Sequence, residues 1–229
     1  VASHGFIAGY AKVNLTPPYR TSTAGYGKRK GALFTSVHDS VFVRTMVINN
    51  GAMKVALVTA DMLIIPPAVT EKLQSVLPVG FDLGNTYLSA THTHNSVGNW
   101  GEGLTGLIYT GPYDDSLVHF IADKIAVSIS KADSNLIPSE LYAGSIPVSG
   151  AVYNRLAGND GNIDSLLRVI EVRRSDSTKL VLTSFTAHAT CLYSKDLELS
   201  RDYPGKLVDE LEENGYTFAM FMAGAVGSH

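Results

Sequence analysis

A β-hairpin early in the chain is the feature that most limits the folds open to this sequence. Residues 40–48 and 53–59 are two runs rich in β-branched side chains, and Asn49-Asn50-Gly51 lies between them. Asparagine and glycine tolerate the positive φ of a tight turn, so the two runs are predicted to pair antiparallel. Such a hairpin argues against a doubly wound sheet, in which parallel strands alternate with crossover helices.

The remainder of the chain mixes strand-like and helix-like segments. Strands are predicted at residues 6–15, 86–91, 141–147, 167–173, 179–186 and 217–222, and helices at 66–77, 114–132 and 203–214, the last with Asp202 as its N-cap. Residues 19–31 and 98–106 are rich in glycine and are expected to be loops, the first of them solvated. We therefore expect a mixed α/β (α+β-like) fold, with hairpins, strand–helix–strand units and flanking helices. No linker divides residues 1–229, which indicates a single domain.

Composition excludes several classes of protein. Lysine and arginine total 18 against 21 acidic residues, a net charge of −3, so the basic face that nucleic-acid binding requires is not expected. The single cysteine, Cys191, excludes an intrachain disulfide and is expected to be a buried free thiol rather than a nucleophile. No apolar run approaches the ~18 residues of a membrane-spanning segment.

Three histidines follow predicted strands. His92 and His94 alternate directly after an apolar run, so on a continuing strand they would share one face. His188 follows the strand at 179–186 in the same way. Neutral imidazole is a common zinc ligand, and a catalytic zinc takes about three protein ligands and a water. The pattern predicts a zinc site at one edge of the sheet. The alternative is that the paired histidines are hydrogen-bonded structural residues.

Other polar residues are weaker candidates. Asp61 follows the second hairpin strand and offers a metal ligand, a partner that fixes an imidazole, or only a turn cap. His229 offers another imidazole or is a tag remnant. The remaining histidines are expected to be structural or at the surface: His4, His38 and His119. Aromatic side chains after the histidine pair suit either an apolar substrate or loop packing: Trp100, Tyr109 and Tyr113.

Short motifs occur in a fixed order along nearly the whole chain. The most specific is Ser-Ala-Thr-His-Thr-His at 89–94, and the others are residues 8–18, 25–26, 38–39, 58–61, 154–155, 187–190, 202–205 and 224–227. In this order they resemble the N-terminal part of the neutral/alkaline (non-lysosomal) ceramidase family. The resemblance implies a zinc-dependent amidase that splits the N-acyl bond of ceramide into a sphingoid base and a fatty acid.

The resemblance also implies roles for particular residues. His92 and His188 would be zinc ligands, and His94 would stabilise the developing oxyanion beside the metal. Arg155 would face the substrate. Residues expected to contact the substrate or support the site are Asp61, Asn95 and Asn154. Because zinc acidifies bound water to a pKa of about 7 and polarises the amide carbonyl, no serine or cysteine nucleophile is required.

The sequence departs from the family pattern in three places. Leu156 stands where ceramidases carry a serine implicated in catalysis, and the loop at 95–100 is altered. The family's glutamate and tyrosine ligands come from a later part of a longer domain and have no counterpart here, because the available glutamates lie at the wrong places: Glu140, Glu171 and Glu198. We expect the chain to be the N-terminal portion of that domain, metal-poor and inactive alone, with the C-terminal remainder of the same protein completing the Zn²⁺ site.

Two other interpretations remain open. A relative that has lost catalysis could bind a lipid or a glycan, and Leu156 and the altered loop favour this reading. An amidohydrolase-type barrel also carries His-x-His, but on its first strand, whereas several strands precede His92 here. The resemblance further implies a lipid-like amide substrate, a role in sphingolipid metabolism and a secreted or periplasmic location.

Overall fold

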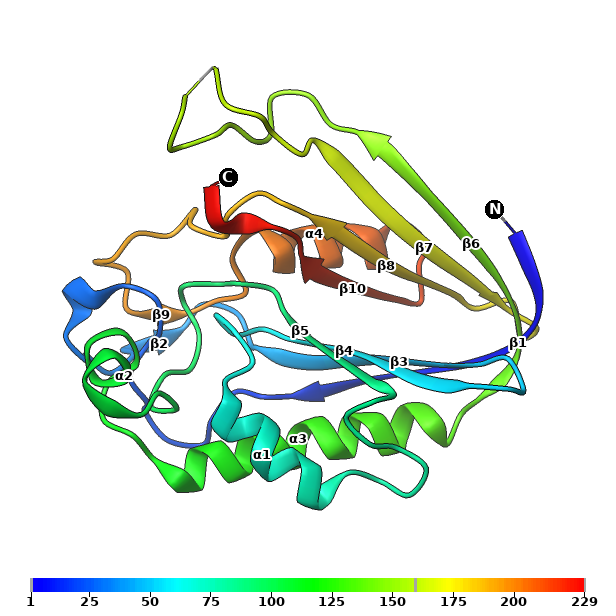
Figure 1. Cartoon of the computed structure of the whole chain (residues 1–229), viewed down its shortest axis with the longest axis horizontal. Helices are drawn as coiled ribbons and strands as arrows, with labels where there is room; N and C mark the ends of the chain where they lie inside the picture. Colours follow the sequence, from blue (N-terminus) through cyan, green and yellow to red (C-terminus); the bar gives the residue numbers. More distant parts are fainter. Residues whose placement is uncertain (1, 159, 229) are drawn as a thin grey trace.

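The computed structural model describes residues 2–158 and 160–228, and its centre is one eight-stranded mixed sheet that folds over into two facing layers (Figure 1). The strand order is β10-β8-β7-β6-β1-β3-β4-β5. The first layer comprises β1 (Ala2–Asn14), β3 (Phe42–Asn49), β4 (Lys54–Ala60) and β5 (Thr86–Ala90). The second comprises β6 (Ile137–Pro147), β7 (Leu166–Arg174), β8 (Lys179–Phe185) and β10 (Phe218–Ala223). Short strands β2 (Ser36–Val37) and β9 (Glu198–Leu199) form a separate parallel pair.

The predicted hairpin is confirmed, and so is the mixed fold class. β3 and β4 pair antiparallel from Val43 opposite Ala60 to Asn49 opposite Lys54, and Gly51 adopts a positive φ of 86° in the turn. In contrast, β4 pairs with β5 and β8 with β10 in parallel, each pair joined through a helix. The sheet therefore combines hairpins with strand–helix–strand units.

Helices cover the outside of both layers. α1 (Pro67–Val76) and α3 (Asp115–Asp133) pack on the first layer, and α4 (Asp202–Glu213) packs on the second. α2 (Gly103–Thr110) lies at one end of the molecule, beside the short 3-10 helix η1 (Gly27–Arg29) (Figure 1). The resulting order of layers is helix, sheet, sheet, helix.

Alternation along the strands fills three cores. Val43 and Val47 of β3 face α3, whereas Met46 between them faces the second layer. On β10, Phe218 belongs to the core between the layers and Phe221 to the core under α4. Burying one such side chain contributes roughly 1.5–3 kcal/mol. Because both faces of these strands are buried, they appear in the sequence as nearly continuous apolar runs.

The structure corrects four sequence expectations. Residues 98–106 include the start of α2, and residues 19–31 are not a solvated loop, since Ser22 and Ala24 are completely buried. Asp202 is not the N-cap of α4 but its first residue, with a φ of +55°, and Arg201 is the N-cap. The Asp202 carboxylate instead accepts hydrogen bonds from the backbone N–H groups of Cys191 and Leu192. Cys191 itself is exposed rather than buried.

None of the described helices is both long enough and apolar enough to cross a membrane.

Candidate metal centre

Three imidazoles meet at one end of the sandwich. One potential ligand atom from each of His92, His94 and His188 lies within 4.8 Å of the other two. The ring centroids are 4.6–5.2 Å apart. His92 and His94 follow β5 in the first layer and His188 follows β8 in the second, so the group bridges the two layers. The three residues therefore converge as expected, but they do so between the two layers and not at one edge of the sheet.

The pairing of His92 with His94 has a different cause from the one predicted. β5 ends at Ala90, and His92 has a left-handed φ of 64°, so the two side chains do not share a strand face. A left-handed backbone at a bulky residue costs on the order of 1–3 kcal/mol and requires surrounding support. Thr91 N–H donates to the carbonyl of Ala60, and Thr93 Oγ1 donates to the carbonyl of Ser200. These bonds hold the turn that aims the two rings at each other.

Hydrogen bonds indicate which ring nitrogens carry protons. His92 Nδ1 lies 2.8 Å from the carbonyl oxygen of Leu63, and His188 Nδ1 lies 2.9 Å from that of Val226. A carbonyl only accepts, so each Nδ1 is the donor and each Nε2 of a neutral ring keeps its lone pair. His94 Nε2 lies 2.9 Å from His188 Nε2 and must then be the donor between them. His94 Nδ1 is buried with no hydrogen-bond partner among the described residues.

Burial disfavours the charged form of all three rings. Burial lowers the pKa of His92 and of His188 below the ordinary value of 6.5. For His94, burial and then the neighbouring His188 and His92 lower the pKa to about 3. Neutral imidazole is the form that ligates metals, and Nδ1 donation to a carbonyl is the usual support for a ligand that binds through Nε2. The Nε2 atoms of His92 and His188 therefore fit a divalent transition metal such as zinc.

Arg155 lies close to the histidines. Its guanidinium donates to the carbonyl of Gly227 at 2.7 and 3.2 Å and lines a cavity together with His188 and Tyr153. Asn154 instead supports the turn around Arg155. Its Oδ1 accepts from the N–H groups of Leu156 and Ala157, and its Nδ2 donates to the carbonyl of Asn162.

Neither the Asp61 nor the Asn95 side chain belongs to the histidine group. The buried Asp61 carboxylate accepts from the N–H of Phe42, and it lies outside the histidine group. Burial raises its pKa to about 6. Asn95 is fully buried, and its side-chain oxygen accepts from Arg29 while its Nδ2 donates to the carbonyls of Asp196 and Glu198. The Asp61 side chain therefore holds the start of β3, and the Asn95 side chain holds the segment 196–198.

Three residues beside His94 are absent from the sequence-based site. Gly25 lies against the His94 ring, Tyr26 contacts it with ring centroids 4.9 Å apart, and Arg29 is a buried cation that donates to the His94 carbonyl. Gly25 and Tyr26 belong to one of the motifs noted above. Nothing in the sequence separates Arg29 from the exposed Lys28 beside it.

The remaining aromatic and histidine candidates divide by exposure. Trp100 is buried, with its indole N–H donating to the carbonyl of Val97, whereas Tyr109 and Tyr113 are exposed. His38 and His119 are exposed and pair with carboxylates, consistent with surface roles. The side chain of His4 and all of His229 lie outside the described residues.

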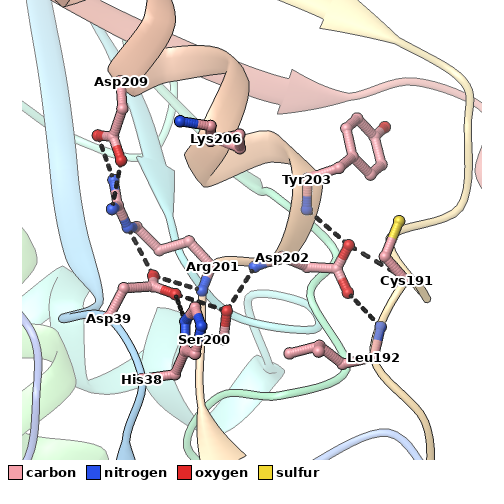
Figure 2. A pocket seen from close by; sticks show the side chains of 10 residues that line it. All are labelled: His38, Asp39, Cys191, Leu192, Ser200, Arg201, Asp202, Tyr203, Lys206 and Asp209. Atoms are coloured by element: carbon pink, nitrogen blue, oxygen red, sulfur yellow. Dashed lines mark hydrogen bonds and ion pairs between the residues drawn. The ribbon is translucent and has the colours of Figure 1, made fainter.

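A separate pocket lies beside the N-terminus of α4 (Figure 2). Arg201 is held there between the carboxylates of Asp39 and Asp209, each at 2.8 Å. In the same view, the Asp202 carboxylate points toward the backbone of Cys191 and Leu192. Partial burial of the Cys191 thiol and the neighbouring Asp202 carboxylate raise the pKa of Cys191, the opposite of what an activated nucleophile needs. Asp202 therefore anchors the loop that follows His188, and the surroundings of Cys191 do not activate its thiol.

Comparison with known proteins links this geometry to one family. The sequence model described as "Neutral/alkaline non-lysosomal ceramidase, N-terminal" matches residues 6–217. The neutral ceramidase of Mycobacterium tuberculosis is 23% identical over 200 residues, covering 79% of this chain and 31% of the relative. The neutral ceramidase of Pseudomonas aeruginosa is 25% identical over 186 residues, covering 74% and 28%. The chain thus spans about a third or less of the length of these curated relatives.

Solved structures agree on the fold. The crystal structure of neutral ceramidase from Pseudomonas aeruginosa aligns with a TM-score of 0.88 at 23% identity, over 99% of this chain and 39% of that one. A structure described as ceramidase complexed with C2 aligns with a TM-score of 0.82 at 24% identity, over 97% and 37%. At these identities the likeness establishes a shared fold.

Proposed function

The chain belongs to the neutral/alkaline non-lysosomal ceramidase family, and on this premise we propose that it takes part in zinc-dependent hydrolysis of the amide bond of an N-acyl lipid such as ceramide. The observation that carries the proposal is the meeting of three neutral imidazoles from the two layers of the sandwich. The curated relatives that match this chain are neutral ceramidases. Because they are about three times as long, activity and substrate are proposed for the full-length polypeptide that contains these residues.

His92 and His188 are the proposed zinc ligands. In each, Nδ1 donates to a backbone carbonyl, which fixes the ring orientation and leaves Nε2 as the ligand atom. The Nε2 lone pair of His188 accepts a hydrogen bond from His94 Nε2, and a bound zinc would take the place of that contact. When bound, zinc supplies an acidified water and a Lewis acid for the amide carbonyl. Two imidazoles leave the rest of a catalytic coordination shell to other residues, which we propose come from the C-terminal remainder of the full-length polypeptide.

His94 and Arg155 are the proposed catalytic residues. His94 carries a proton on Nε2, the nitrogen that faces His188, and this N–H can donate to the oxygen on which negative charge develops. Its lowered pKa keeps the ring a neutral donor across the ordinary pH range. Arg155 places a positive charge on the cavity that His188 also lines, where it can orient a polar group of the substrate.

The test combines metal analysis with turnover. In the full-length polypeptide, His92→Ala and His188→Ala are expected to lose both bound zinc and release of fatty acid from a labelled N-acyl sphingoid substrate. His119→Ala removes an exposed imidazole on α3 and serves as the matched control. Wild-type protein that hydrolyses the substrate without any bound metal, or zinc that is retained in both variants, would contradict the proposal.

A catalytically inactive lipid- or glycan-binding module is the second candidate. Leu156, at the position of the family serine, is 82% exposed and presents an apolar side chain near Arg155. Saturable lipid binding without turnover by zinc-loaded wild-type protein would favour this second function.

A further inference from the structure

Arg29 is a buried cation whose hydrogen bonds all go to neutral oxygen atoms. Arg29 is only 6% exposed, and this burial lowers the pKa of its guanidinium. The acceptors are the carbonyl oxygens of Ala24, His94, Tyr193, Ser194 and Asp196 and the side-chain oxygen of Asn95. A guanidinium has five N–H donors in a fixed planar arrangement, so this set of acceptors suits arginine and not lysine.

These bonds join three segments that are distant in sequence. Residues 24–29 carry the arginine, residues 94–95 include His94, and residues 193–196 lie in the loop that follows His188. The loop is further anchored by Tyr26, whose hydroxyl donates to the carbonyl of Leu192 at 2.8 Å. One side chain therefore sets the main chain of His94 relative to the segment that follows the opposing histidine.

The same region also restrains the His94 ring. A Cβ added to Gly25 would lie 2.6 Å from Nδ1 and 2.8 Å from Cγ of His94, closer than real contacts allow. Gly25 is itself fixed, since its N–H donates to the carbonyl of Tyr109 and its φ is +111°. His92 and His188 are oriented by hydrogen bonds from Nδ1, but Nδ1 of His94 has no partner among the described residues. Packing against Gly25 takes the place of that bond.

We propose that Arg29 and Gly25 are positioning residues for His94. Arg29 holds the backbone of His94, and Gly25 restrains the imidazole ring of His94. The catalytic importance of this placement rests on the proposed function, whereas the placement itself does not. Loss of a supporting residue around a metal site typically lowers activity or affinity by about 10–100-fold. We expect a fall of that size in kcat for Arg29→Lys and for Gly25→Ala, with KM much less affected.

Matched controls separate positioning from general destabilisation. Lys28→Gln removes an exposed cation from the same short helix. Gly215→Ala places an alanine at a similar φ of +104° where no atom lies within 4 Å of the new Cβ, so it adds backbone strain without touching a histidine. Gly25→Ala and Gly215→Ala are both expected to lower the melting temperature, but only Gly25→Ala is expected to lower kcat.

The readout that does not depend on activity is the NMR signal of the His94 ring in full-length protein with labelled histidines, assigned by its loss in His94→Ala. Gly25→Ala and Arg29→Lys should shift this signal, and the two controls should not. In a His94→Ala background, the positioning substitutions should cause no further loss of kcat. If Arg29→Lys fails to fold, Gly25→Ala decides the question.

The outcomes distinguish the two hypotheses. If wild-type protein hydrolyses no N-acyl lipid but the His94 signal shifts in both positioning variants, the proposed function fails and the positioning of His94 stands. If Gly25→Ala behaves like Gly215→Ala in both the NMR signal and kcat, the positioning inference is overturned whatever the wild-type activity.

Discussion

His94 and His188 face each other nitrogen to nitrogen, with their Nε2 atoms 2.9 Å apart. His94 follows β5 at one edge of the sheet, and His188 follows β8, the neighbour of the strand at the other edge. The contact exists only because the sheet folds over and brings its two ends together. Thr59 Oγ1 donates across the interface to the carbonyl of Phe221, which helps to fix the two layers in register. The geometry of the site is therefore a consequence of packing between the layers.

The two facing histidines are expected to respond differently to substitution. His188→Ala should remove zinc, because it deletes a proposed ligand. Loss of a residue that only supports a ligand lowers metal affinity by about 10–100-fold, and the loss in His188→Ala should be larger. His94→Ala should retain zinc and lose turnover, because it deletes a hydrogen-bond donor to the developing charge. Zinc stoichiometry and kcat measured on the same preparations check both statements. Loss of zinc in His94→Ala would instead make His94 a ligand.

Metal-free protein is expected to lose stability as the pH falls below about 6.5. The pKa of His94 is lowered from 6.5 to about 3 in the folded state, so between these values the unfolded chain binds a proton that the folded protein does not. At about pH 5 this difference amounts to roughly 2 kcal/mol. Urea unfolding in the presence of a chelator, at about pH 7.5 and pH 5, should show a smaller acid loss for His94→Gln than for wild type. Equal losses would contradict the lowered pKa.

The regular elements were predictable from sequence because their signals are local. The Asn-Asn-Gly turn between 40–48 and 53–59 and the helical spacing over 114–132 each reflect one element and its own burial. The positions of His92 and His188 after strands also indicated that their side chains could meet, and in the structure they do. What these patterns lacked was the fold-over of the sheet, which depends on contacts between residues far apart in the chain.

The surroundings of His94 were not predictable for the same reason. Arg29 belongs to a glycine-rich basic segment that is typical of a solvated loop, yet it is buried by carbonyl groups that lie 164–167 residues later in the chain. The left-handed φ of His92 likewise has no signature in the residues around it. The burial of Arg29 and the backbone of His92 both depend on hydrogen bonds with segments far along the chain, which the composition of the local segment does not reveal.

Asp61→Asn is expected to stabilise the protein more at high pH than at low pH. Burial raises the pKa of Asp61 from 3.8 to about 6, so its favourable contribution is complete below about 3.8 and is lost as the pH rises through 6. The neutral amide removes that loss, so the gain in unfolding free energy should grow by roughly 2 kcal/mol between about pH 4.5 and pH 8. Any constant offset from the amide cancels in this comparison. A pH-independent difference in urea midpoints would show that Asp61 is ionised throughout.

Leu156→Ser tests whether the family serine could still act at this position. Leu156 is 82% exposed on a turn that Asn154 closes, so the substitution should change the unfolding free energy by no more than about 0.5 kcal/mol. If hydrolysis depends on zinc and His94, kcat should also stay close to the wild-type value. Leu156→Ala is the matched control, because it removes the same apolar side chain without adding a hydroxyl. A rise in kcat confined to the serine variant would show that a hydroxyl at this position joins the reaction, and the role given to water in the proposed function would then be wrong.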